Sequence, residues 1–289
     1  PILKSKNMDT LYHYTTIDAL LNMVKTDSQL HFWATRYDYL NDGEELKKGI
    51  EVLNSIIPKI EKEFNTEEAK KISGYITELG NKLEKYYKSG NAGFYVISLS
   101  EEADSLPMWR MYGNDCNGIA IGLDFDTVYH EYDKTEIVGK EKFREVSYEG
   151  DKNIEHTIKS IYELWKTLEV QEGMELANEY ANIVNLLCIY IKSHHFAYEK
   201  EWRVALYDWD IKPDDIDEKY YRPIRFRNKN GIIIPYKEIS LTTNAIKSIT
   251  LGPGYDLNRS EASLKMFLKS KNIDTDKVKI TQSNVPYYP

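Results

Sequence analysis

The segment "GFYVISLSEEADSLPMWRMYGNDCNGIAIGLDF", residues 93–125, predicts two β-strands joined by a short polar connection. Residues 93–100 and 118–125 are rich in aliphatic and aromatic side chains, as is typical of strands that pack on a core. The connection between them has room for about one helical turn. We therefore expect both strands to belong to one central sheet.

Further strands and helices are predicted on both sides of this segment. The other strand candidates are residues 11–16, 30–35, 201–207, 246–254 (with a glycine turn) and 277–281. A helix is predicted for residues 16–25, where Thr15 and Asp18 have capping-box spacing, and another for residues 261–269.

Two longer helical blocks interrupt the strands. Apolar residues recur every three or four positions within about 44–88 and again within about 152–195, which predicts amphipathic helices. The chain shows no internal repeat, low-complexity tract or Pro/Gly-rich linker, so residues 1–289 are expected to form a single domain. The predicted fold class is α+β, a mixed sheet with two helical inserts.

Composition excludes several classes of protein. The chain has 289 residues and a formal net charge of −8, which argues against a general nucleic-acid-binding surface. No apolar run reaches the roughly 18 to 20 residues that cross a bilayer, and the first ten residues lack the apolar stretch of a signal peptide. Cys116 and Cys188 form no disulfide framework, so a cytoplasmic location is expected. The abundance of Lys, Asn, Ile and Tyr suggests a bacterial coding sequence.

The segment "YEKEWRVALY", residues 198–207, carries two nearby acids. In a strand, Trp202, Val204 and Leu206 share one face and predict a core. Glu199, Glu201 and Arg203 share the other face, where the two carboxylates are roughly 7 Å apart. One interpretation is an exposed edge on which Arg203 pairs the acids. The other is a carboxylate that points into a cleft.

An aromatic turn follows the strand that carries Ser98 and Ser100, two side chains on the same face. Trp109 and Tyr112 lie in this turn together with two methionines. They predict either a satellite hydrophobic cluster under a loop or a wall for a flat aromatic ligand.

Known catalytic motifs do not account for the histidines or glycines. Taken alone, His13 is more typical of a hydrogen-bonded structural residue, and the adjacent His194 and His195 cannot share one helix face as metal ligands. Residues 252–254 lack the spacing of a phosphate-binding glycine loop. No serine-hydrolase, zinc-hydrolase or Cys/His motif occurs, so no metal is expected.

Five motifs occur in an order that resembles domain-of-unknown-function family 2971 over nearly the whole chain. They are "LYHYTT" (11–16), "YLNDGEE" (39–45), "ISLSEEADSLPMWRMYGNDCNGIAIGLDF" (97–125), "AYEKEWRVAL" (197–206) and "ITLGPG…VPYY" (249–288). This family supplies no activity by itself.

A more distant likeness does imply an activity. The first, third and fourth motifs resemble the His-Tyr-Glu arrangement of the ADP-ribosyltransferase fold. The resemblance implies that His13 hydrogen-bonds the adenosine-side ribose of NAD, and that Tyr112, or Trp109 in its place, stacks on nicotinamide. It also implies that Glu201, with Glu199 as the alternative, contacts the nicotinamide-side ribose.

The implied reaction is cleavage of the nicotinamide–ribose bond with NAD as co-substrate. Thr15 and either Ser98 or Ser100 would add hydrogen bonds to the substrate, and a carboxylate would stabilise positive charge on the sugar. The expected protein is an ADP-ribosyltransferase or NAD glycohydrolase, such as a bacterial toxin or phage-defence effector, with an unidentified acceptor.

Two other functions stay open. One is a binding or regulatory module on the same fold, without catalysis. The other is a glycoside or nucleotide hydrolase that uses Glu199 and Glu201 as paired carboxylates, although two acids on one strand are a poor match for groups that must flank a bond.

Overall fold

The structure is a computed structural model. It describes residues 8–25, 28–44, 46–67, 69–71, 73–74, 77–78, 81, 93–132, 142–172, 187–208, 222–229 and 231–287. No helix in these ranges is both long and apolar enough to span a bilayer.

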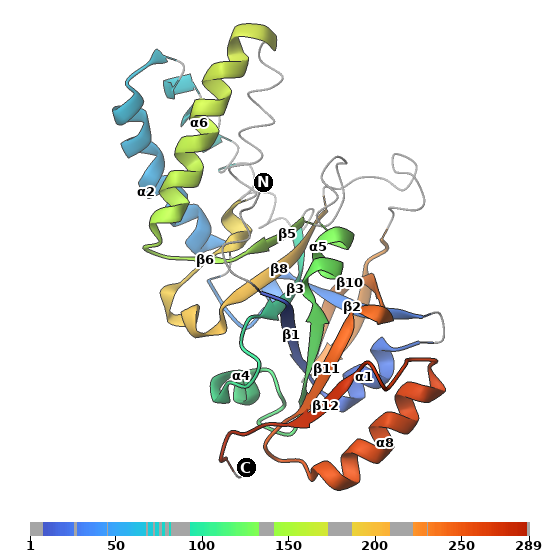
Figure 1. Ribbon diagram of the computed structural model, residues 1–289. Coiled ribbons are helices and arrows are strands. Elements are labelled where there is room, and N and C mark those ends of the chain that lie inside the picture. The colour runs from blue at the N-terminus through green and yellow to red at the C-terminus, as the bar shows by residue number, and fades with distance from the viewer. Residues whose placement is uncertain are drawn as a thin grey trace.

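Strands and helices are interleaved along the chain (Figure 1). The strands are β1 (Thr10–Thr15), β2 (Gln29–Arg36), β3 (Gly93–Ser100), β4 (Ile119–Asp124), β5 (Lys142–Glu145), β6 (Ser147–Tyr148), β7 (Ile191–Lys192), β8 (Glu201–Asp208), β9 (Arg225–Lys229), β10 (Ile232–Thr242), β11 (Ile246–Leu251) and β12 (Lys279–Gln282). The α-helices are α1 (Ile17–Met23), α2 (Lys47–Phe64), α4 (Leu106–Met111), α5 (Phe125–Tyr132), α6 (Lys152–Glu172) and α8 (Leu257–Ser270). The 3-10 helices are η1 (Tyr37–Tyr39), η2 (Leu187–Tyr190), η3 (His194–Glu199) and η5 (Thr243–Ala245).

Ten strands form one sheet, in the order β12-β11-β4-β1-β3-β2-β10-β9, with β8 beside β3 and β5 beside β8. The pairs in this sheet are antiparallel except β11 with β12. The predicted α+β class with a mixed sheet is therefore confirmed.

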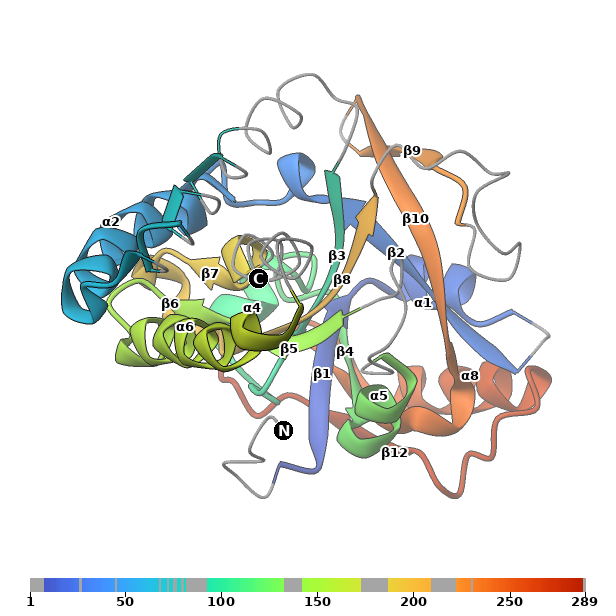
Figure 2. The same cartoon turned by 90° about the horizontal axis from the view of Figure 1, so that it is seen from above.

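Strand β3 joins two parts of the sheet that diverge from each other. One edge of β3 pairs with β8 along its full length. The other edge meets β1 only at Ser100 and β2 only at Tyr95 and Val96. Residues 97–99 consequently have no partner on this edge among the described strands, and β1 and β2 run apart there (Figure 2). This fork is the feature of the fold that creates space for a site.

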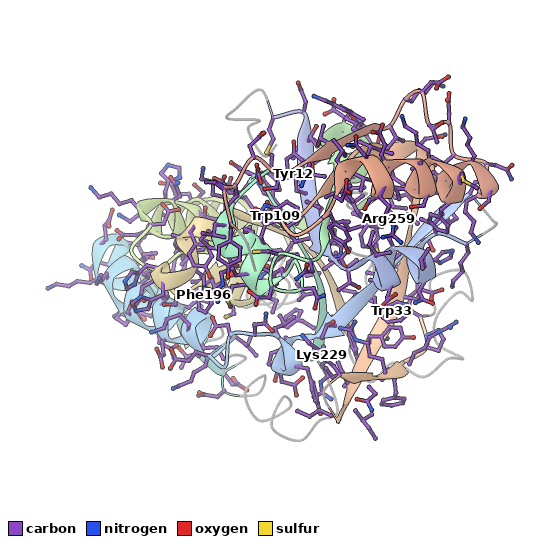
Figure 3. All side chains as sticks on the ribbon, turned by 90° about the horizontal axis from the view of Figure 1, so that it is seen from below. Tyr12, Trp33, Trp109, Phe196, Lys229 and Arg259 are labelled. Carbon is purple, nitrogen blue, oxygen red and sulfur yellow. The ribbon has the colours of Figure 1, made fainter. Side chains whose placement is uncertain are left out.

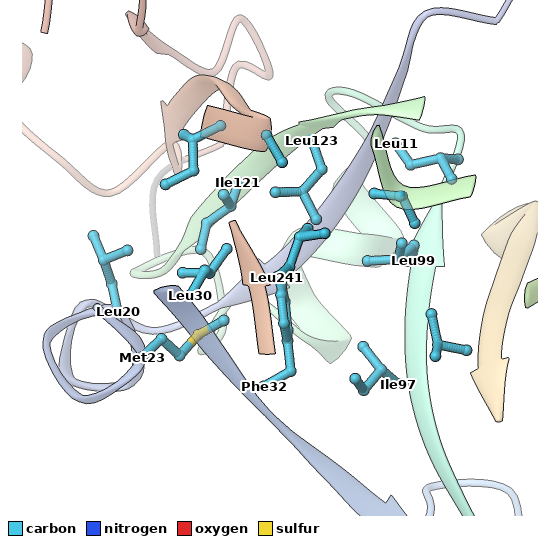
Figure 4. Packing of buried hydrophobic residues seen from close by; sticks show 14 of the residues in the cluster. Leu11, Leu20, Met23, Leu30, Phe32, Ile97, Leu99, Ile121, Leu123 and Leu241 are labelled. Atoms are coloured by element: carbon cyan, nitrogen blue, oxygen red, sulfur yellow. The ribbon is translucent and has the colours of Figure 1, made fainter. Parts of the chain in front are cut away.

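The main hydrophobic core lies between the sheet and the helices α1, α5 and α8. Its side chains come from strands far apart in sequence, such as Leu11, Leu99 and Leu241, which converge in Figure 4. Trp202, Val204 and Leu206 are buried in this core, as their alternation in the sequence predicts.

Helices α2 and α6 form a second packing unit beside the sheet (Figure 1). Buried aliphatic residues of α2, including Ile57 and Ile60, pack with Ile154 and Ile158 of α6. The rings of Phe64 and Tyr162 stack with centroids 5.8 Å apart. The two helical blocks predicted between strands therefore contact each other in the fold.

Two local predictions about helix ends are wrong. Thr16, not Thr15, caps helix α1, because its hydroxyl accepts a 3.0 Å hydrogen bond from the Ala19 amide. The second helical block does not continue to residue 195, since residues 187–192 form a 3-10 turn and strand β7.

Other elements were not predicted. Strands β5, β6, β9 and β10 and helix α5 were not expected from the sequence. The predicted helical residues 82–88 and 173–186 lie outside the described part of the chain.

Candidate functional site

A cavity of about 520 Å³ lies where β1 and β2 diverge from β3. Its volume is in the range of small-molecule sites. The described residues that line it include Tyr12, His13, Thr15, Phe32, Trp33, Ser98, Ser100, Met111, Tyr112, Lys192, Glu199, Glu201, Arg203, Arg227 and Lys229. The fork therefore brings the first strand, the aromatic turn and the start of β8 to one place.

His13 of β1 compensates for the missing strand partner of β3. Its Nδ1 lies 3.1 Å from the carbonyl oxygen of Ser98, within the stretch of β3 that no described strand pairs on that edge. A carbonyl can only accept, so Nδ1 carries the proton. The buried environment lowers the pKa of His13, which favours the neutral ring. In that tautomer, Nε2 is a hydrogen-bond acceptor.

Glu201 and Arg203 form a buried ion pair on β8. Glu201 is 2% exposed and Arg203 is 0% exposed. The guanidinium donates from Nε to Oε1 at 2.8 Å and from Nη2 to Oε2 at 3.0 Å. Arg203 also donates to the carbonyl oxygen of Ile189. The interpretation as an exposed edge is wrong, because β8 lies between β3 and β5 and this face is buried.

Glu199 is the last residue of the 3-10 helix η3, separated from β8 by Lys200, and is 3% exposed. Lys200 adopts a left-handed conformation with φ 41°, so the strand alternation does not extend back to Glu199. The Lys192 ammonium bridges the two acids, 2.7 Å from Glu199 Oε2 and 3.1 Å from Glu201 Oε2. Tyr112 donates from its hydroxyl to Glu199 Oε1 at 2.6 Å.

The two carboxyl groups differ in their electrostatics. Burial raises the pKa of Glu199, and the attraction of Lys192 only partly opposes this shift. Burial acts on Glu201 in the same direction, but Arg203 and Lys192 outweigh it and lower the pKa of Glu201 to about 2. Neighbouring carboxyls whose pKa values are pushed apart are typical of acid–base sites.

The predicted serines and threonine have different positions. Ser98 lines the cavity, and its hydroxyl hydrogen-bonds Glu201. Ser100 is buried, where it donates to the Glu199 carbonyl at 2.6 Å and accepts from the Glu102 amide at 3.0 Å. Ser100 therefore holds the backbone that carries Glu199. Thr15 lines the cavity at the end of β1.

The two candidate rings of the aromatic turn are separated by the fold. Trp109 is fully buried; it contacts the ring of Tyr14 at 4.7 Å and donates to Asp104 at 2.7 Å. It is absent from the cavity lining, whereas Tyr112 is present there. Figure 3 labels Trp109 in the small cluster beside Tyr12. The satellite cluster predicted for this turn therefore exists around Trp109, whereas Tyr112 lies in the cavity lining.

Gly113 makes this arrangement of the turn feasible. A Cβ at residue 113 would lie 2.8 Å from both the ring and the carbonyl oxygen of Trp109. Because that contact is too short for a side chain, the glycine allows the chain to pass close to Trp109 directly after Tyr112.

Reasoning from the sequence missed Lys192 and Arg227 as site residues. Lys192 lies in a segment for which a helix was predicted, and Arg227 lies on an unpredicted strand. The one available signal was the pair of acids at 199 and 201, which needs buried cations to offset its charge. No cluster of potential metal ligands occurs in the described residues.

Tyr112→Phe is expected to raise the pKa of Glu199 further. The hydroxyl of Tyr112 stabilises the ionised carboxylate, so its removal favours the protonated form. Carbon-13 NMR titration of the Glu199 carboxyl, assigned with Glu199→Gln, measures the change. Tyr198→Phe is the matched control, because Tyr198 is partly exposed. An unchanged titration in Tyr112→Phe contradicts the expectation.

The fold and cavity define a mixed α+β protein whose sheet forks around a buried ionic cluster. Residues 108–204 match the model of a family described as protein of unknown function (DUF2971). The predicted resemblance to this family is confirmed over that segment, which contains Tyr112, Glu199, Glu201 and Arg203. Searches of curated proteins and of solved structures returned no match.

Proposed function

We propose that this protein binds NAD in the cavity and cleaves the nicotinamide–ribose bond, transferring ADP-ribose to an acceptor or to water. The observation that carries the proposal is the convergence of His13, Tyr112 and Glu199 on one cavity from separate parts of the chain. Each has a chemical role in this reaction that follows from its contacts.

His13 would hold a ribose of the substrate. The neutral ring directs its Nδ1 proton to Ser98, so Nε2 is the acceptor for a ribose hydroxyl. No hydrogen bond to Nε2 occurs within the described residues, which supports an external partner.

Glu199 is the better candidate for the reacting carboxylate, although the resemblance favours Glu201. Glu201 already accepts from both Arg203 and Lys192, and its low pKa keeps it from taking a proton near neutral pH. Glu199 has the raised pKa and the hydrogen bond to a residue of the cavity wall. Its carboxylate can take a proton and can stabilise a nearby cation.

The reaction balances without a metal or a redox partner. The bond between C1′ of the ribose and the pyridinium nitrogen breaks, and its electron pair neutralises the departing nicotinamide. The oxygen of the acceptor then bonds to C1′, and its proton passes to Glu199. Tyr112 can provide an aromatic surface for the leaving ring while its hydroxyl orients Glu199.

Ligand binding without turnover is a second candidate function. The observation that favours it is the pairing within the ionic cluster: Lys192 and Arg203 offset the charges of Glu199 and Glu201. Such a cluster could serve only to shape a binding cavity.

Nicotinamide release from NAD, measured by chromatography, tests the proposal. We expect release by the native chain and NAD binding by calorimetry, with about tenfold weaker binding in His13→Ala because one buried hydrogen bond is lost. His194→Ala is the control, since that side chain is 62% exposed. Assays with water, protein and nucleic acid as acceptors identify the transfer.

The possible results separate the two functions. Binding of NAD without nicotinamide release indicates a binding module. Absence of NAD binding at millimolar concentration rejects both roles for NAD.

A further inference from the structure

The cavity has a second charged end, formed by β2, β9 and the turn after β2. Arg227 and Lys229 of β9 line it together with Trp33 and Thr35 of β2. Figure 3 labels Trp33 on the side of the molecule opposite Phe196, with Lys229 between the two. Phe196 marks the ionic cluster, since the Lys192 ammonium lies 4.6 Å from its ring centroid.

The guanidinium of Arg227 is held in place by contacts that do not neutralise it. Its Nη2 donates to the Thr35 hydroxyl at 2.8 Å, and its Cζ lies 5.5 Å from the ring centroid of Trp33. The ring of Trp33 in turn packs against Tyr236 at 4.9 Å. These contacts orient the cation while leaving its charge available.

One donor of Arg227 lacks a partner. The Nε atom is buried and makes no hydrogen bond to any described residue. An unsatisfied buried donor is costly and indicates a group that a ligand can satisfy.

The charges of the cavity also do not cancel. The described lining residues include two carboxylates, Glu199 and Glu201, and four permanent cations, Lys192, Arg203, Arg227 and Lys229. Lys192 and Arg203 pair with the two acids, which leaves Arg227 and Lys229 without a carboxylate in the lining. Burial is the main cause that lowers the pKa of His13, and the charge of Arg227 lowers it further.

We propose that this end of the cavity is an anion subsite that binds the diphosphate of a nucleotide ligand. The planar guanidinium supplies charged donors suited to phosphate oxygens, and the exposed Lys229 adds a flexible cation to the lining. The subsite extends the proposed function. It rests on that function only for the identity of the nucleotide. It would place the diphosphate of NAD away from the bond that breaks.

Calorimetry with inorganic pyrophosphate, ADP-ribose and adenosine tests the subsite. We expect the intact chain to bind pyrophosphate and ADP-ribose, more weakly as salt is raised. Arg227→Gln should weaken both about tenfold or more, because a charged hydrogen bond is lost, and should leave adenosine binding unchanged.

Arg225→Gln is the matched control. It removes the same charge from the same strand, but Arg225 is exposed and is not in the cavity lining. Equal weakening in both variants, or no binding of pyrophosphate and ADP-ribose by the intact chain, overturns the subsite. Lys229→Gln provides a second test if Arg227→Gln does not fold. Unchanged binding of pyrophosphate and ADP-ribose by Lys229→Gln would overturn the contribution of Lys229 to the subsite.

Failure of the proposed function has a different signature. If NAD yields no nicotinamide while Arg227→Gln still weakens ADP-ribose binding selectively, the subsite stands and the cleavage reaction does not. If nicotinamide is released equally well at subsaturating NAD by Arg227→Gln, cleavage stands and the subsite does not.

Discussion

Glu199→Gln is expected to reduce nicotinamide release from NAD by about 10²–10⁴-fold, the usual contribution of a general acid or base. The amide keeps the size of the side chain, but it cannot take the proton of the acceptor and it carries no charge to stabilise the sugar cation. Nicotinamide release at saturating NAD, followed by chromatography, measures the effect.

The fold should tolerate this substitution. Burial already disfavours the ionised form of Glu199, and Lys192 retains Glu201 as a partner when the charge is removed. The thermal midpoint is therefore expected to change little, and NAD binding should persist.

Glu102→Gln is the matched control for Glu199→Gln. Glu102 is a nearby acid whose side chain is 30% exposed and pairs with Lys200. Its loss should leave nicotinamide release unchanged. Full activity in Glu199→Gln would remove that residue as the reacting group.

Strand alternation predicted part of this site correctly. Trp202, Val204 and Leu206 enter the main core because β8 keeps a period of two from Glu201 onward. The same pattern failed at Glu199, since the left-handed Lys200 ends the regular geometry. A single backbone conformation at one residue thus separates two acids that the pattern treats as equivalent.

The cavity itself could not be predicted from local patterns. It depends on how β1 and β2 share one edge of β3, a long-range pairing that no sequence window contains. The two cations come from other elements: Lys192 lies on β7, only seven residues before Glu199 in the sequence, whereas Arg227 enters from β9. Motif order did predict that His13, Tyr112 and the acids belong together, and all of them line the cavity.

The residue types also do not show which ring of the aromatic turn is buried and which one lines the cavity. Trp109 and Tyr112 are three positions apart in one turn, so either could face a ligand on spacing alone. Trp109 is buried because Tyr14 and Asp104 lie on its side of the turn. Asp104 lies in the loop directly before α4, but Tyr14 lies on β1, which only the tertiary fold brings to the turn.

Arg203→Met is expected to lower the free energy of unfolding by about 3–5 kcal/mol at neutral pH, the cost of breaking a buried ion pair. Arg203 is fully buried, and its loss leaves Glu201 with Lys192 as its remaining cation. The bond to the Ile189 carbonyl is lost as well. Urea unfolding of the native chain and the variant measures the difference.

The pH dependence gives a sharper test of the same pair. The pKa of Glu201 is about 2 in the folded chain and 4.5 as its ordinary value, so folding favours the ionised form. Its contribution to stability is complete above pH 4.5 and is lost as the pH falls toward 2. In Arg203→Met the free energy of unfolding should fall less between pH 4.5 and pH 2 than in the native chain. The reason is that Arg203 is the largest cause that lowers the pKa of Glu201.

A double variant separates charge from packing. Glu201→Leu combined with Arg203→Met removes both charges and leaves Lys192 paired with Glu199 at 2.7 Å. Replacing a complete buried pair by apolar groups is often neutral, so the double variant should recover at least half of the stability lost in Arg203→Met. A double variant as unstable as Arg203→Met would instead attribute the loss to packing around the arginine stem, and the ion pair would not explain the stability of this face of β8.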